Sequence, residues 1–203
     1  GHKPFRCEAS NCKPVKGKIT PLQYTESGSV IPGIDEWPHS WPDGEVSYRL
    51  NNFSRDIAKE SHQLRAVTVA FRTWQIRINK LKLRRERNPD VSVDIDISFR
   101  PKSYFDGDNT LAVAYYPGQG RISGNTNIND VWNWVTSSKD AGLNAPPLVP
   151  VLIHEFGHSL GLRHDTTARA SIMYPAYSLS KPINDLHSND IQRIQSKIGR
   201  AHV

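Results

Sequence analysis

The chain has 203 residues, of which 37% are hydrophobic and 23% charged, and its formal net charge is +6 at pH 7. This composition excludes disordered and collagen-like chains, and the length allows one domain with an appendage. No apolar run approaches the roughly 20 residues that a membrane helix needs, so we expect no membrane span.

Residues 1–38 are rich in turn-forming Pro, Gly and Ser and show little apolar periodicity. We expect them to form an N-terminal extension and residues 39–203 to form the packed domain. Cys7 and Cys12 are the only cysteines. Two cysteines are too few for a cysteine-rich zinc module. They could form a small disulfide loop if the protein is exported, or stay as free thiols.

Three strands and one helix are predicted in the first part of the domain. Residues 45–50 alternate enough for a strand. Ser54 is a candidate helix N-cap, and an apolar stripe of a long amphipathic helix follows it and ends near Trp74. Apolar and polar residues alternate over 91–98, which predicts a half-buried strand, and 111–116 is another candidate strand.

Two further helices are predicted toward the C-terminus. Residues 136–147 form a loop that leads into a helix from about Leu148, and Gly161 is a natural stop for that helix. Ser188 is the expected cap of a third helix, with Gly199 past its end. Since strands and helices are interspersed, we expect a mixed α and β fold around one sheet.

One short segment carries three histidines and a glutamate at metal-ligand spacing. His154 and His158 are four residues apart, so on a helix they share one face, and Gly161 lets the chain turn so that His164 can reach the same ion. Three neutral ligands leave a fourth position for water, which is typical of a catalytic zinc. We therefore predict one catalytic zinc, with Glu155 placed to deprotonate the zinc-bound water.

Met173 is the only methionine of the chain and follows His164 by nine residues. Alone, a methionine in an apolar segment is usually core filler. Beside the zinc motif, we expect it to be the Met-turn, which forms a hydrophobic floor under the three imidazoles.

These residues resemble the metzincin metalloproteases, and within them the matrixins, over about residues 40–200. Six further segments are similar to the matrixin pattern: 46–50, 105–107, 111–114, 117–120, 174–177 and 190–195. The resemblance implies an α+β, metzincin-like zincin fold, with a twisted mixed five-stranded sheet and three helices. The third helix would lie in a small C-terminal subdomain below the cleft.

The resemblance also implies a zinc-dependent endopeptidase that acts on protein or peptide substrates and is secreted or extracytoplasmic. The substrate would lie extended along an edge strand, by strand addition near Leu111, Ala112 and Val113. The side chain after the scissile bond would enter a pocket bounded by the zinc helix and by Pro175 and Tyr177. An apolar residue would be preferred there, because a hydrophobic slot offers no charge partner.

The sequence departs from the matrixin pattern where that family usually binds a second, structural zinc and calcium. The positions of the structural zinc ligands are occupied by Phe99, Pro101, Val113 and Asn127. Since none of these residues can bind zinc as an imidazole or carboxylate does, we predict that the structural zinc is absent. Asn129 and Trp132 stand where carboxylates would be expected, which leaves calcium binding in doubt.

Several alternatives remain open. Asp165 follows the third histidine, as in the adamalysin branch of the metzincins, and only Arg6-Cys7 matches the matrixin latency motif. Residues 1–38 could be an extended arm or the remnant of a propeptide. Cys7 could also bind the zinc through its thiolate and keep the protein in a latent form. A non-catalytic module could instead hold an anionic polymer on the basic run from Arg77 to Arg87, but an intact Glu155 argues against it because a structural zinc needs no base.

Overall fold

The computed structural model describes residues 14–15, 36–107, 109–179 and 182–199. Most of the predicted extension, with Cys7, Cys12 and the question of latency, lies outside the described residues. The described helices are α1 (Glu60–Gln75), α2 (Leu148–Ser159) and α3 (Ser188–Ile198), with short 3-10 turns at Lys102–Tyr104, Gly120–Ile122 and Ser138–Asp140. None of the helices in the described part of the chain is long and apolar enough to span a membrane.

Five strands form one mixed sheet in the order β3-β2-β4-β6-β5. Their bounds are β2 Gly44–Leu50, β3 Leu81–Arg85, β4 Ile95–Arg100, β5 Ala112–Ala114 and β6 Thr126–Asn129. The first four in this order are parallel, whereas β5 is antiparallel to β6 and forms an edge of the sheet. A second, two-stranded sheet pairs β1 (Pro14–Val15) in parallel with β7 (Tyr177–Ser178). The five-stranded mixed sheet and the three helices confirm the predicted α+β fold.

An aromatic stack joins the sheet to helices α1 and α2. Phe71 of α1 lies between Tyr48 of β2 and Phe156 of α2, with ring centroids 4.1 and 3.7 Å apart. The indole N–H of Trp74 donates a hydrogen bond of 2.8 Å to the carbonyl of Ile153 within α2. Since all of these side chains are buried, α2 is fixed against both α1 and the sheet.

The first helix begins at Glu60, so the prediction of Ser54 as its N-cap is wrong. The side chain of Gln63 binds both the N–H and the carbonyl of Ser54, at 2.8 and 2.7 Å, and this satisfies the backbone in a loop conformation. Ile57 is nevertheless buried, as its place in the apolar stripe predicts.

Other element boundaries also differ from the sequence prediction. The strand predicted over 91–98 begins only at Ile95, because Arg49 binds the carbonyl of Val91 and holds that segment as a loop. The N-cap of α3 is His187 rather than Ser188. Strands β3 and β6 were not predicted, and β3 lies within the basic run.

Candidate metal centre and substrate pocket

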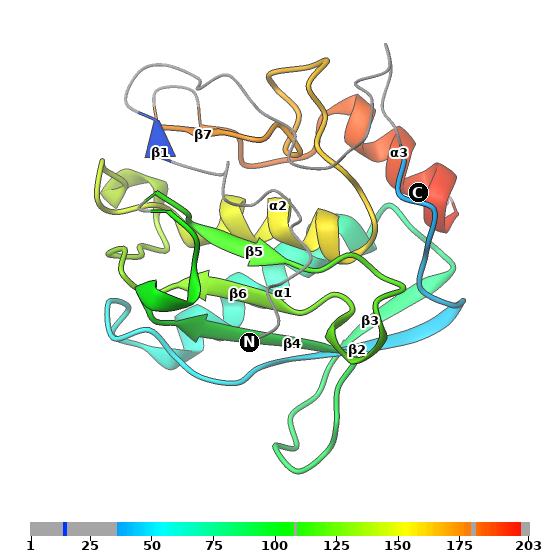
Figure 1. Ribbon diagram of the computed structural model, residues 1–203, viewed down its shortest axis with the longest axis horizontal. Coiled ribbons are helices and arrows are strands. Elements are labelled where there is room, and N and C mark those ends of the chain that lie inside the picture. The colour runs from blue at the N-terminus through cyan, green and yellow to red at the C-terminus, as the bar shows by residue number, and fades with distance from the viewer. Residues whose placement is uncertain (1–13, 16–35, 108, 180–181, 200–203) are drawn as a thin grey trace.

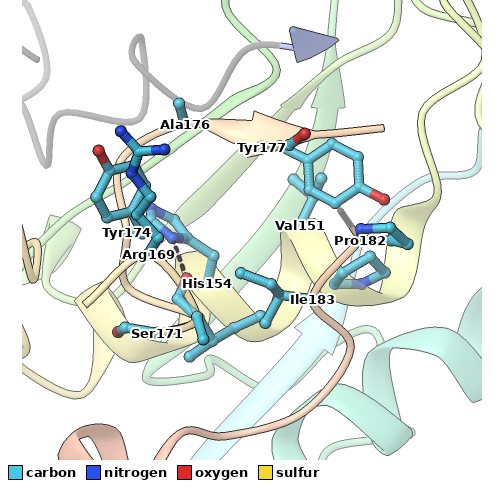
Figure 2. Close-up of a pocket in the computed structure, with 13 residues that line it drawn as sticks. Val151, His154, Arg169, Ser171, Tyr174, Ala176, Tyr177, Pro182 and Ile183 are labelled. Atoms are coloured by element: carbon cyan, nitrogen blue, oxygen red, sulfur yellow. Dashed lines mark hydrogen bonds between the residues drawn. The ribbon is translucent and has the colours of Figure 1, made fainter. Parts of the chain in front are cut away.

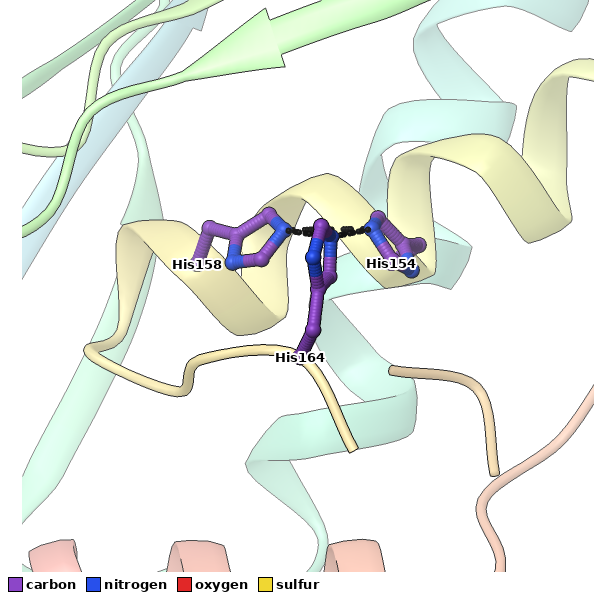
Figure 3. Close-up of side chains that lie close together, drawn as sticks. All are labelled: His154, His158 and His164. Carbon is purple, nitrogen blue, oxygen red and sulfur yellow. Dashed lines mark hydrogen bonds between the residues drawn. The ribbon is translucent and has the colours of Figure 1, made fainter. Parts of the chain in front are cut away.

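Helix α2 and the turn after it bring the three predicted zinc ligands together (Figure 3). His154 and His158 project from one face of α2. Gly161 follows the helix with φ = +108°, a backbone conformation that residues other than glycine rarely adopt. The amide of Gly161 donates to the carbonyl of His158, and the chain then reverses so that His164 faces the other two rings.

The spacing of the three imidazoles fits one zinc ion. The Nε2 atom of His158 lies 3.1 Å from Nε2 of His154 and 3.1 Å from Nε2 of His164, and the third pair is 3.3 Å apart. Nitrogen ligands placed tetrahedrally at about 2.0–2.1 Å from a zinc ion are about 3.3–3.4 Å from one another. Within the described residues, this is the one group of three ligating side chains close enough to share an ion.

Backbone carbonyls orient two of the rings. Nδ1 of His154 lies 2.6 Å from the carbonyl oxygen of Ile172, and Nδ1 of His158 lies 2.7 Å from that of Leu162. A carbonyl can only accept, so the hydrogen of each neutral ring is on Nδ1 and the lone pair of Nε2 points to the centre of the cluster. Converging lone pairs repel one another unless a cation lies between them, so the donor set fits a metal.

Burial keeps these imidazoles neutral. Desolvation lowers the pKa of His154 from 6.5 to about 4, against the opposing effect of its hydrogen bond to Ile172. Desolvation and the neighbouring rings hold the pKa values of His158 and His164 well below 6.5. Neutral imidazole is the form that binds zinc, so the site is ready for metal at neutral pH.

Met173 is fully buried and packs against the zinc helix at Gly157. A Cβ atom at Gly157 would collide with the sulfur of Met173 and with the ring of Trp74. The glycine of the zinc motif thus allows the Met-turn to approach the helix closely.

Asp190 of α3 organises the turn that contains Met173, and sequence reasoning missed it. Its carboxylate accepts hydrogen bonds from the Ser171 hydroxyl at 2.5 Å, from the Ile172 amide at 2.9 Å and from the His187 amide at 2.8 Å. The last contact belongs to the capping box of α3. An acidic residue three positions after the cap was the signal available in the sequence.

Glu155 and Asp165 are both fully buried. Glu155 follows His154 directly on α2, as the motif requires. Asp165 holds the His164 turn in place: its amide donates to the carbonyl of Met173, and its carboxylate accepts from Thr167 and from Asn189 of α3.

A cavity of about 340 Å³ opens beside His154 (Figure 2). Val151 of α2 lines one side and Tyr177 and Ile183 line another, while the exposed Arg169 adds a charge. Tyr177 was predicted as a pocket wall; Pro175 is not among the lining residues, whereas its neighbours Tyr174 and Ala176 are. Burial raises the pKa of Tyr177 to about 12, so its hydroxyl stays neutral.

The predicted substrate-binding segment lies at the sheet edge next to α2. Leu111, Ala112 and Val113 are all buried, and in the described part of the chain β5 pairs with β6 alone. Figure 1 shows β5 running alongside the zinc helix.

Asn127, at one of the positions of the matrixin structural zinc ligands, belongs to a polar cluster with Arg100 and Tyr104. Nε of Arg100 donates to the Asn127 side chain at 3.0 Å, and the Arg100 guanidinium lies over the Tyr104 ring. The Asn127 amide in turn donates to the Tyr104 hydroxyl at 3.3 Å. The Arg100 guanidinium is a permanent cation without an acceptor atom, so it cannot serve as a metal ligand.

The candidate calcium residues are tied together by indole hydrogen bonds. Asn129 and Trp132 both donate to the carbonyl of Thr110 at 2.9 Å, and Trp134 donates to the carbonyl of Asn129 at 2.8 Å. The side chains of Trp132 and Trp134 thus act as hydrogen-bond donors here, whereas Asn129 also accepts a hydrogen bond from the Val131 amide.

The middle of the basic run forms strand β3. Lys82 and Arg84 are exposed on the strand, while Leu81 is buried and Arg85 is half-buried. Arg84 is paired with Glu45 and with Glu86 at 2.5 Å each, so part of the positive charge is neutralised.

Comparison with known proteins agrees with this geometry. The family model of the matrixins matches residues 37–199. Matrix metalloproteinase-25 of Homo sapiens is 30% identical over 97% of this chain and 34% of its own length. Interstitial collagenase of Bos taurus is 34% identical over 78% of this chain and 33% of its own length, and matrix metalloproteinase-18 of Xenopus laevis is 35% identical over 80% and 34%.

This chain thus spans about a third of the length of each of these relatives. The match to the matrixin model decides the question that Asp165 had left open between two metzincin branches. The chain therefore belongs to the matrixin family of zinc metalloendopeptidases.

Proposed function

We propose that this chain is a catalytic domain that hydrolyses peptide bonds, with zinc held by His154, His158 and His164. The observation that carries the proposal is the convergence of three Nε2 atoms within 3.1–3.3 Å of one another. Zinc supplies a Lewis acid that polarises the scissile carbonyl and lowers the pKa of water.

Glu155 is the proposed general base. Its carboxylate takes a proton from the attacking water and then delivers this proton to the leaving amine. Its position directly after the ligand His154 on α2 and its complete burial support this role. Met173 and Asp190 serve the same reaction indirectly by fixing the floor and the orientation of the histidine cluster.

The substrate is proposed to bind as an extended strand along Leu111, Ala112 and Val113. The free edge of a strand offers backbone groups to any peptide, and side-chain pockets then supply selectivity. The side chain after the scissile bond enters the cavity beside His154, whose wall includes Val151 and Tyr177. Because most of this lining is apolar, an apolar residue is preferred there.

We further propose one catalytic zinc per chain and no structural zinc, while Asn129 and Trp132 in place of carboxylates disfavour calcium binding. The proposed catalytic domain covers residues 39–203 and is preceded by an extension over residues 1–38. We propose that it acts outside the cytoplasm, as the names of the collagenases among its relatives suggest. The basic run from Arg77 to Arg87 stays a candidate surface for an anionic polymer, weakened by the pairing of Arg84.

A mixed peptide library, cleaved with and without a zinc chelator, tests the proposed function. We expect hydrolysis that the chelator abolishes and added zinc restores, with apolar residues enriched after the cleaved bond. Zinc binding without hydrolysis would favour the non-catalytic module, and hydrolysis that is indifferent to the chelator would contradict the mechanism.

A further inference from the structure

Glu36 and Trp37 lie against helix α3, and Figure 1 shows this segment, in blue, running beside the helix. Nε of Arg193 donates to the Glu36 carboxylate at 2.7 Å, and Nζ of Lys197 donates to the carbonyl of Trp37 at 2.6 Å. The two basic residues are four positions apart and so share one face of α3. The helix therefore grips this segment at two points.

Arg193 also connects the Glu36–Trp37 segment to the third histidine of the zinc cluster. Its Nη2 atom donates to the carbonyl of Arg163 at 2.9 Å, and Arg163 directly precedes His164. The side chain of Arg193 is only 8% exposed, and among the described residues Glu36 is the carboxylate in contact with it. A buried cation needs such a partner, so Glu36 fixes Arg193, and Arg193 fixes the backbone next to His164.

Trp37 connects the same segment to a second histidine. Its ring stacks on Tyr116 with centroids 4.6 Å apart, and its indole N–H donates to the carbonyl of Pro117 at 2.9 Å. Tyr116 in turn meets the ring of His158 edge-on at 5.5 Å. The guanidinium of Arg163 lies over the Trp37 ring, 5.3 Å from its centroid.

We propose that Glu36, Trp37 and Arg193 are positioning residues that hold His158 and His164 at the spacing zinc requires. Two separate contact paths start at neighbouring residues and end at two different ligands. Loss of either path lets one imidazole move relative to the others, and this lowers zinc affinity. The proposal rests on zinc binding by the histidine cluster, and it concerns how this chain tunes that site.

The test compares zinc dissociation constants of the full chain, measured by competition with a chromophoric chelator. Glu36→Gln keeps the size of the side chain and removes its charge, and a cavity of about 350 Å³ beside Glu36 and Arg193 leaves room for it. Residues that support metal ligands change metal affinity by roughly 10- to 100-fold when mutated. We expect weakening in that range for Glu36→Gln and for Trp37→Leu, with Trp37→Phe in between because it keeps a ring on Tyr116.

Glu45→Gln is the control, because it also removes a Glu–Arg ion pair, here the exposed pair with Arg84 on strands β2 and β3. Its zinc affinity should stay within twofold of the parent chain. The proposal is overturned if Glu36→Gln and Trp37→Leu also stay within twofold, even when both lower the thermal unfolding midpoint of the zinc-free chain. Failure of the parent chain itself to bind zinc would instead refute the proposed function.

Discussion

The carboxylate of Asp190 holds the backbone residue that orients His154. Asp190 accepts a hydrogen bond of 2.9 Å from the amide of Ile172, and the carbonyl of Ile172 lies 2.6 Å from Nδ1 of His154. Helix α3 is thereby connected to the metal cluster through a single residue, Ile172. The zinc motif by itself does not indicate that the orientation of His154 depends on Asp190.

Asp190→Asn should weaken both the fold and the metal site. An amide of the same size loses acceptor capacity, so a buried donor is left without its partner, at a cost of about 1–3 kcal/mol. Zinc affinity should fall roughly 10-fold or more, because His154 loses its fixed orientation. Urea unfolding and chelator competition measure the two effects.

Asp185→Asn is the control for this variant, since Asp185 is exposed and, among the described residues, accepts a hydrogen bond from the neighbouring Leu186 amide. We expect it to match the parent chain in both measurements. If Asp190→Asn also matches the parent chain in unfolding free energy and in zinc affinity, the contact from α3 to His154 contributes to neither.

Glu155→Ala should keep zinc and lose hydrolysis. A general base contributes about 10²–10⁴-fold to the rate, so kcat/KM for a fluorogenic peptide should drop by at least two orders of magnitude. Zinc content, measured on the same sample, should be unchanged. Glu60→Ala, at the exposed start of α1, controls for loss of an acidic residue. A folded Glu155→Ala variant with full activity would refute the mechanism.

Gly157→Ala should destabilise the domain. Its Cβ would collide with the sulfur of Met173 and the ring of Trp74, and overpacking of this kind costs about 1–3 kcal/mol. Gly142→Ala is the matched control, because a Cβ there meets nothing within 4 Å. Urea unfolding of the zinc-free chains compares the two, and equal stabilities would show that the Met-turn does not press on the helix.

The zinc-free chain should lose stability in mild acid. The pKa of His154 is lowered from 6.5 to about 4, so between these values the unfolded chain binds more protons than the folded chain. The contribution is complete above pH 6.5 and is lost as the pH falls toward 4 and below, on the order of 3 kcal/mol for this residue.

Unfolding free energies of zinc-free samples between pH 7 and 4.5 measure this loss. His154→Asn cannot be protonated in this range, so its free energy should fall less steeply with acid than that of the parent. His62→Asn, at an exposed position on α1, should follow the parent. Parallel curves for the parent and His154→Asn would exclude the predicted linkage.

The metal cluster was predictable because its determinants are local. The spacing of His154 and His158 on one helix face needs only helical geometry, and Gly161 marks the turn that returns His164. The apolar stripe that ends near Trp74 likewise follows from periodicity alone. These features do not depend on which distant segment packs against them.

The remaining features depend on contacts between residues far apart in the sequence. Gln63 binds the backbone at Ser54 and delays the first helix, a competition that cap preferences cannot reveal. Strand β3 was not predicted because it lies at a sheet edge and three of its five residues are basic, so apolar alternation is weak there. The Glu36–Arg193 pair joins residues that are 157 positions apart in the sequence.

X-ray absorption at the zinc edge, on the full chain loaded with zinc, tests the central claim most directly. We expect three nitrogen ligands at about 2.0–2.1 Å and one oxygen ligand. His164→Asn should remove one imidazole from this signal. A spectrum with fewer than three imidazoles in the parent chain, or one dominated by sulfur at about 2.3 Å, would contradict the account.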